Sequence, residues 1–292
     1  MNRRRFLTIT AAAWAAPASA GVTTWQSTAL GGTLLLDLRG PRALSADLAT
    51  GIAATIEEVE AAASLFRPES ALSQLNATGR LDDPPRALRD LLALADDMHR
   101  LTGGLFDPTV QPLWQALAMG RDPASARAAI GWDRVQWQGA LRLDTGQALT
   151  LNGLAQGYAA DRVAALLRQA GYGPALIDMG EFAVLGGPFR LGVEDPEGGL
   201  MATRTLTGGA MATSSPGAMR LGMSGHILGP QGQPPRWSTV SVEAPWAGLA
   251  DGLSTAFCLM EADAIGAVAA RAGATRVMAV DAGGDFSTLF VS

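Results

Sequence analysis

Residues 149–181, LTLNGLAQGYAADRVAALLRQAGYGPALIDMGE, constrain the fold most, because they predict a strand, a glycine turn, a helix and a second strand in one short unit. Asn152-Gly153 is a turn signal, and glycine permits unusual φ angles or close approach of a ligand. Apolar residues then recur at helical spacing up to Gly171, a residue type that ends helices. The run 174–178 predicts a buried strand. The helix N-terminus could hold a phosphate, or the unit could simply be ordinary α/β packing.

The composition excludes several kinds of chemistry. All 22 basic residues are arginines, so a P-loop lysine, a Schiff-base lysine and a Ser-Lys dyad are ruled out. The two histidines, His99 and His226, and the single Cys258 cannot build a Cys/His zinc site. A bound metal would need oxygen ligands, which favour Mg²⁺ or Ca²⁺. The net charge of -5 argues against binding to nucleic acid or to an anionic membrane.

Residues 1–20 have the features of an export signal, namely an arginine cluster, a short apolar segment and the small-residue end Ala18-Ser19-Ala20. The run Arg3-Arg4-Arg5-Phe6-Leu7 resembles a twin-arginine signal, so we expect residues 21–292 to form an exported, periplasmic domain. No cysteine lies near the cleavage point, so a lipoprotein is not expected. No later apolar run reaches the roughly 20 residues of a membrane span.

Hydrophobic periodicity predicts the remaining elements. We expect helices near residues 52–66, 84–101, 245–260 and 262–271, and strands near 28–38, 189–193, 203–206, 237–244, 276–280 and 286–291. His99 lies off the apolar stripe of its helix and is expected to be exposed. The fold class is therefore α/β (α+β), a single domain with a mixed sheet and packed helices. A nucleotide cleft is expected between the turns at 102–114 and 149–158.

The segment 245–260, PWAGLADGLSTAFCLM, places two polar residues in a helix of otherwise small and apolar side chains. Asp251 and Thr255 are four residues apart, so their oxygens project from one face and can share a cation. The alternative is that Asp251 only complements the helix dipole. The spacing is compatible with both interpretations.

Several segments together resemble the ApbE family, the FAD:protein FMN transferases, in the family's order over nearly the whole mature chain. They are FRPESALSQLN (66–76), TGGLFDPTVQPLW (102–114), LNGLAQGYAADRV (151–163), DMGE (178–181), GVEDP (192–196), His-Ile (226–227) and LADGLSTA (249–256). The resemblance implies an enzyme that uses Mg²⁺ to cleave FAD, releases AMP and attaches FMN by a phosphoester to a Thr or Ser. The acceptor would be a periplasmic or membrane-anchored redox protein. Some relatives hydrolyse FAD to FMN and AMP instead.

The resemblance also implies roles for individual residues. Gly153, through its carbonyl, Asp251 and Thr255 would bind Mg²⁺. His226 would accept the proton of the acceptor hydroxyl or bind phosphate, and a purely structural histidine is the alternative. The residues expected to contact FAD are Leu30, Phe66, Leu105, Phe106, Asp107, Thr150, Gln156 and Ile227.

Three departures from the family pattern concern polar contacts. Thr150 stands where relatives usually have Asp, Gln156 where they have a charged residue, and Gly229-Pro230-Gln231-Gly232 where they have Asp-Pro-Arg-Thr-Gly. These departures make a flavin-binding protein without turnover an alternative. An FAD pyrophosphatase is a further alternative, because some relatives hydrolyse FAD. A serine hydrolase built on Ser224 and His226 is disfavoured, because a nucleophile elbow and a placed carboxylate are missing.

Overall fold

The structure is a computed structural model that describes residues 22–29 and 31–292. The export signal expected in residues 1–20 and the FAD contact expected at Leu30 lie outside the described residues. Within the described ranges, none of the helices combines the length and the apolar character needed to traverse a membrane.

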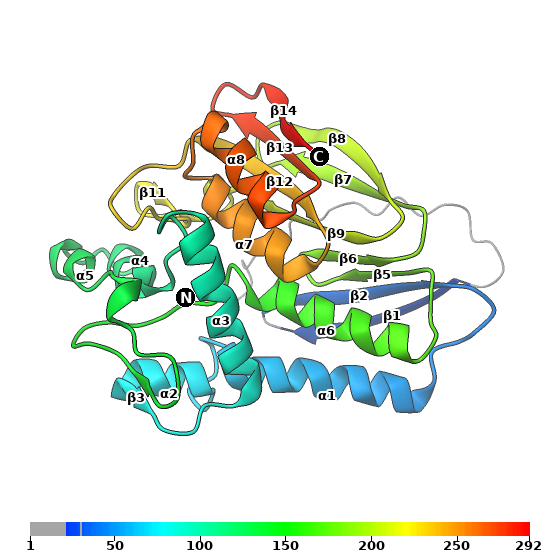
Figure 1. Ribbon diagram of the computed structural model, residues 1–292, viewed down its shortest axis with the longest axis horizontal. Coiled ribbons are helices and arrows are strands. Elements are labelled where there is room, and N and C mark those ends of the chain that lie inside the picture. The colour runs from blue at the N-terminus through cyan, green and yellow to red at the C-terminus, as the bar shows by residue number, and fades with distance from the viewer. Residues whose placement is uncertain (1–21, 30) are drawn as a thin grey trace.

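An 8-stranded sheet forms the centre of the molecule, in the order β1-β2-β5-β6-β9-β12-β13-β14 (Figure 1). Its strands are β1 (Val22–Ala29), β2 (Gly32–Arg39), β5 (Ala175–Asp178), β6 (Phe182–Leu185), β9 (Gly209–Ser214), β12 (Trp237–Ala244), β13 (Arg276–Asp281) and β14 (Phe286–Val291). The α/β class and the single domain are confirmed. In place of the mixed sheet that we expected, neighbouring strands are antiparallel throughout the described part of the sheet.

The difference arises at residues 149–151, which we expected to form a strand before the glycine turn. This segment is instead held by a side chain: Asn76 Nδ2 donates to the Leu149 carbonyl at 2.8 Å, and Asn76 Oδ1 accepts from the Leu149 amide at 2.7 Å. The Thr150 amide donates to the Pro108 carbonyl. Since residues 149–151 form no strand directly before helix α6 (Ala155–Gln169), the expected strand–helix–strand crossover does not form, and β5 pairs antiparallel with β2.

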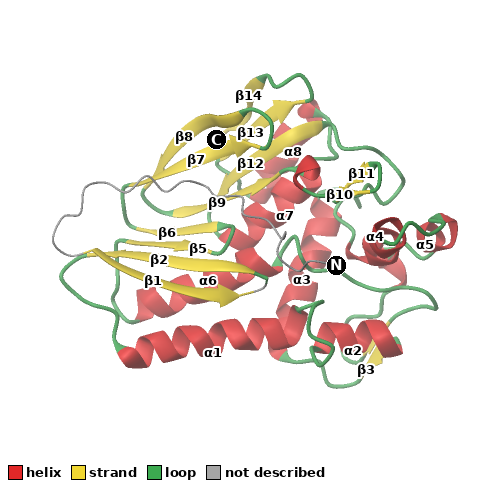
Figure 2. Cartoon of the chain, turned by 180° about the vertical axis from the view of Figure 1, so that it is seen from behind, coloured by secondary structure: helices red, strands yellow, loops and turns green. Residues whose placement is uncertain are grey.

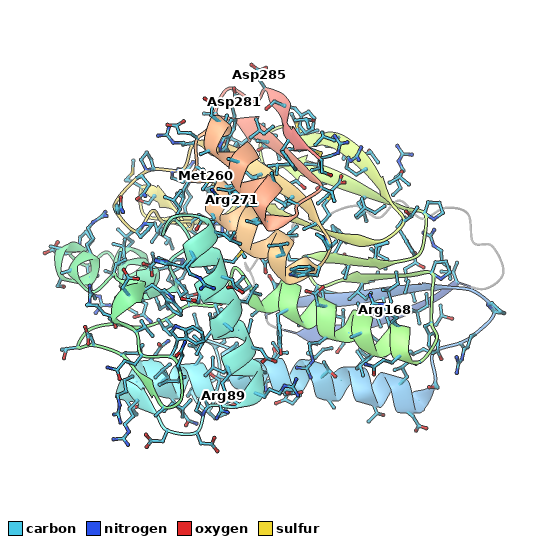
Figure 3. The ribbon with its side chains drawn as sticks, viewed as in Figure 1. Arg89, Arg168, Met260, Arg271, Asp281 and Asp285 are labelled. Carbon is cyan, nitrogen blue, oxygen red and sulfur yellow. The ribbon has the colours of Figure 1, made fainter. Side chains whose placement is uncertain are left out.

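Helices α1 (Ala46–Ala63), α6, α7 (Ala247–Phe257) and α8 (Ala262–Ala272) cover one face of the sheet, and α3 (Arg86–Leu101) packs against α1, α7 and α8 (Figure 1). The other face is covered by the hairpin of β7 (Phe189–Asp195) and β8 (Gly199–Leu206), seen in front in Figure 2. Charged side chains such as Arg89, Arg168 and Arg271 point outward from α3, α6 and α8 (Figure 3).

The shorter elements gather at one end of the molecule, beside α3 (Figures 1 and 2). They are α2 (Ala71–Thr78), α4 (Gln111–Ala118), α5 (Ala124–Ala128), β3 (Arg80–Leu81), β4 (Leu141–Arg142), β10 (Arg220–Leu221) and β11 (Ser224–Gly225). One-turn 3₁₀ helices are formed by Pro108–Val110, Trp132–Arg134 and Pro216–Ala218. Of these elements, α4 and the 3₁₀ helix Pro108–Val110 contribute residues to the cavity described next.

Candidate functional site

A cavity of about 440 Å³ lies where the glycine turn before α6 meets α7, the end of β9 and the loop that follows β11. Its walls contain all the residues that the sequence assigned to a site within the described ranges. These are Phe66, Leu105, Phe106, Asp107, Thr150, Gly153, Gln156, His226, Ile227, Asp251 and Thr255. Segments that are far apart in the sequence are thus brought to one place, and their individual roles stay predictions.

Helices α6 and α7 cross at a point that has no room for a side chain. A Cβ atom at Gly157 would lie only 2.5 Å from the carbonyl oxygen of Ala247. This closeness lets the Gly157 amide donate to Asp251 Oδ2 at 3.2 Å. One turn further along α6, the Asp161 carboxylate accepts from the Ala247 and Gly248 amides, each at 2.8 Å, and so caps α7. The segment GLAQGYAAD therefore fixes the helix that carries Asp251.

Gly153 is in direct contact with α7. A Cβ atom there would lie 2.9 Å from Thr255 Oγ1 and 3.4 Å from Phe106 Cε2. Its φ angle is outside the left-handed region, so the site needs glycine for close approach rather than for the turn. On the other side, Ser214 Oγ lies 3.3 Å from Thr255 Oγ1. The three residues assigned to Mg²⁺ therefore face the same cavity.

Two carboxylates at the cavity, Asp251 and Glu181, are buried without an arginine partner among the described residues. Burial is the main cause that raises the pKa of Asp251 to about 7; the Gly157 amide opposes this, and the charge of Asp161 adds to it. Burial likewise raises the pKa of Glu181 well above its usual value, and Asp251 contributes. A bound cation would offset the cost of ionising these groups.

The donor set is suited to a hard cation. It consists of the Asp251 carboxylate, the Thr255 hydroxyl and the Gly153 carbonyl, which are all oxygen donors. Within the described residues there is no group of three His, Cys, Asp or Glu side chains that could hold a metal. The protein would then supply only part of the coordination shell, and substrate oxygens or water would supply the rest, which is the usual arrangement for Mg²⁺.

The aromatic wall of the cavity is fixed by the turn after α3. Thr102 Oγ1 accepts from the Phe106 amide at 3.0 Å, and His99 Nδ1 lies 2.9 Å from the Phe106 carbonyl. The expectation that His99 is exposed is wrong: its ring is partly buried, because the turn folds back over it. Asp107 Oδ1 accepts from the Thr109 amide at 2.8 Å, so one of its oxygens caps the 3₁₀ helix Pro108–Val110.

His226 follows β11 and reaches the cavity next to Ile227. Its Nδ1 lies 3.2 Å from the Pro216 carbonyl. Because a carbonyl only accepts, Nδ1 carries the proton, and Nε2 is then the acceptor of the neutral ring. Burial lowers the pKa of His226, although backbone hydrogen bonds to Pro216 and Met219 act in the opposite direction. The ring is therefore neutral near pH 7.

Of the positions that depart from the family pattern, Thr150 and Gln156 line the cavity, whereas the run Gly229–Gly232 does not. The Gln156 side chain lies over Gly180, where a Cβ atom would be 3.3 Å from its Nε2. The Gly232 amide donates to the Gly229 carbonyl at 2.9 Å, so the shortened run closes as a tight turn. The sequence interpretation missed Glu181 and Ser214, which also line the cavity, although Glu181 ends the DMGE motif.

The fold and the site together define an α/β protein with a cavity in which buried oxygen donors face an apolar wall. The chain belongs to the ApbE family, whose sequence profile matches residues 23–279.

Known relatives agree with this membership. The FAD:protein FMN transferase of Salmonella typhimurium is 27% identical over 279 residues, which cover 84% of this chain and 80% of that protein. The Vibrio cholerae flavin transferase ApbE superposes with a TM-score of 0.78 at 24% identity, covering 92% of this chain and 97% of that one. The apo form of the Pseudomonas stutzeri flavinyl transferase ApbE has a TM-score of 0.78 at 25% identity, over 91% and 95% of the two chains.

Proposed function

We propose that this chain is an exported, Mg²⁺-dependent FAD:protein FMN transferase. It would move FMN from FAD to a Thr or Ser hydroxyl of an acceptor protein and release AMP. Family membership and the names of the relatives support a flavin transferase. The observation that carries the proposal is that Gly153, Asp251 and Thr255 face the same cavity as His226.

The ion would be held by Asp251, Thr255 and the carbonyl of Gly153. When bound, Mg²⁺ supplies positive charge against the diphosphate oxygens of FAD. The side chains and backbone of the protein would hold the ion and the substrate in position. Asp251 contributes the negative charge of the site, and the Gly157 amide keeps its Oδ2 in place. Leu105 and Phe106 provide apolar surface for the flavin ring and reduce access of water.

His226 would act as the general base through Nε2. The acceptor hydroxyl gives its proton to Nε2, and its oxygen forms a bond to the phosphorus on the FMN side of the diphosphate. The bond between that phosphorus and the bridging oxygen breaks, and AMP leaves with the bridging oxygen. No electrons are transferred between redox states. Water in place of the acceptor hydroxyl would give free FMN and AMP.

The test is incubation of the wild-type chain with FAD, Mg²⁺ and acceptor proteins that carry a Thr or Ser flavinylation segment. We expect mass spectrometry to find one added FMN on the acceptor and one AMP released per addition. The variant Asp251→Asn should lose at least about 100-fold in rate, since a direct charged ligand matters more than the outer partners of a metal site. Asp263→Asn, an exposed carboxylate on α8, is the matched control and should keep its rate.

The other outcomes identify the alternatives. AMP and free FMN without acceptor labelling would assign an FAD pyrophosphatase. FAD binding without AMP release would assign a flavin-binding protein, which the changes at Thr150 and Gln156 make worth testing. An unchanged rate in Asp251→Asn would refute the metal site.

A further inference from the structure

The end of β9 connects the two sides of the cavity through consecutive residues. In extended chain, successive side chains point to opposite sides. Ser214 turns toward α7, with its Oγ 2.8 Å from Ser254 Oγ and 3.3 Å from Thr255 Oγ1. Ser215 turns the other way, with its Oγ 2.8 Å from Thr239 Oγ1. The two consecutive residues thus contact the proposed cation site on one side and the buried Thr239 of β12 on the other.

The contact of Ser215 leads to a buried carboxylate. Thr239 Oγ1 donates to Asp195 Oδ2 at 2.7 Å, so the Thr239 hydroxyl accepts from Ser215. All three side chains are at most 4% exposed. Asp195 Oδ1 accepts from the amides of Glu197 and Gly198, so both carboxylate oxygens are held. Since Asp195 accepts from Thr239, and Thr239 accepts from Ser215, the three side chains form one directed chain of hydrogen bonds.

The carboxylate is ionised in the folded protein. Burial acts to raise the pKa of Asp195, but the hydroxyls of Ser238 and Thr239 and the two backbone amides together lower it below its usual value. An ionised carboxylate only accepts, so it fixes the direction in which the Thr239 and Ser215 hydroxyls donate.

Pro216 directly follows Ser215 in the chain, so the peptide backbone links the Ser215 hydroxyl to the Pro216 carbonyl. This carbonyl accepts from the His226 amide, and His226 Nδ1 lies 3.2 Å from it. A Cβ atom at Gly225, the residue before His226, would lie 2.4 Å from this oxygen, so the backbone on both sides of this contact packs closely. Any rotation of the peptide between Pro216 and Gly217 would therefore change the partner of the imidazole.

We propose that Asp195 is a positioning residue for His226, acting through Thr239 and Ser215 on the Pro216 carbonyl. The carbonyl keeps the proton on Nδ1 and leaves Nε2 as the acceptor. Because Ser214 in the same segment contacts Thr255, the segment also sets the separation between the cation site and the histidine. The catalytic meaning of this inference rests on the proposed function.

The test compares Thr239→Val with Ser238→Ala. Thr239→Val keeps the shape of the side chain but removes the hydroxyl that joins Asp195 to Ser215. Ser238 donates to the same Asp195 oxygen at 2.6 Å without leading to Ser215, so it is the matched control. A second variant, Thr239→Ser, restores the hydroxyl. The measurements are the rate of FMN transfer and the ¹⁵N NMR tautomer of His226, which is simple to assign in a chain with two histidines.

We expect Thr239→Val to lower kcat about tenfold with KM for FAD unchanged, since misplacement of a base affects the chemical step. The Nδ1-protonated form of His226 should lose population, while His99 stays as it is. Ser238→Ala and Thr239→Ser should both resemble the wild type.

An unchanged tautomer in Thr239→Val would overturn the inference, and so would equal effects of Thr239→Val and Ser238→Ala. If the wild-type chain transferred no FMN, the proposed function would fail. The tautomer comparison needs no turnover and would still decide whether Asp195 positions the imidazole.

Discussion

The substitution Gly157→Ala tests how closely α6 and α7 must approach. The added Cβ would lie 2.5 Å from the Ala247 carbonyl oxygen, whereas ordinary contacts begin at 3.4 Å. The two helices would have to separate by about 0.9 Å, the difference between these distances, because the atoms that the Cβ would meet are backbone atoms of Ala247 and Gly248. The same separation would break the hydrogen bond from the Gly157 amide to Asp251.

The energetic terms have different signs. Alanine gains about 1 kcal/mol of helix propensity over glycine. Overpacking costs about 1–3 kcal/mol, and loss of a buried hydrogen bond to a carboxylate costs about 1.5–3 kcal/mol. We expect a net loss of about 2–5 kcal/mol, which lowers Tm by roughly 5–20 °C for a chain of this size. A displacement near 1 Å at the cation site should reduce kcat about 100-fold.

Thermal and urea unfolding, together with the FMN-transfer assay, check this prediction. Gly266→Ala on α8 is the matched control, because nothing lies within 4 Å of its added Cβ. It should gain up to about 1 kcal/mol from helix propensity and keep full activity. If Gly157→Ala were as stable and as active as Gly266→Ala, the backbone contact between α6 and α7 would not be the constraint that we infer.

Three further predictions concern single side chains. Thr255→Val keeps the shape of the residue but removes one oxygen donor, so the Mg²⁺ concentration for half-maximal rate should rise about tenfold, as a metal titration of the rate would measure. Asp195→Asn should lose about 1–3 kcal/mol at pH 7, because it removes charged hydrogen bonds. Since the pKa of Asp195 is lowered by folding, its contribution is present above about pH 4 and is lost as the pH falls through the folded value, so urea unfolding should find the variant and the wild type converging in acid. Burial raises the pKa of the Cys258 thiol, and we expect it to resist alkylation in the folded protein and react fully in urea; fast labelling without denaturant would contradict this.

The local sequence pattern was sufficient to predict many of the helices and strands. The helix after the glycine turn, the strand β5 and the helix α7 were all predicted from spacing, and Asp251 and Thr255 were predicted to share a helix face. The strand β9 was missed, because GAMATS shows neither β-branched enrichment nor a regular alternation.

The remaining errors come from contacts between distant segments. The helical spacing predicted that His99 is exposed, because spacing reports only on the faces of the helix itself. It carries no information about the turn at 102–106, which folds over the His99 ring. The contact between Asp195 and Thr239 joins a hairpin to a central strand, and no spacing rule connects them. Residues 149–151 looked like a strand because their apolar side chains are buried, but Asn76 takes the place of a neighbouring strand.

Helices α6 and α7 contact each other through backbone atoms of Gly157 and Ala247. Thr150 and Gln156 line the cavity with their side chains and are not part of that contact. Changes in ligand preference can therefore accumulate at these two positions without altering the spacing of the two helices. A library randomised at positions 150 and 156 should yield folded proteins with differing nucleotide selectivity. The unusual residues at these two positions mark sites where ligand preference can change while the packing of α6 on α7 stays the same.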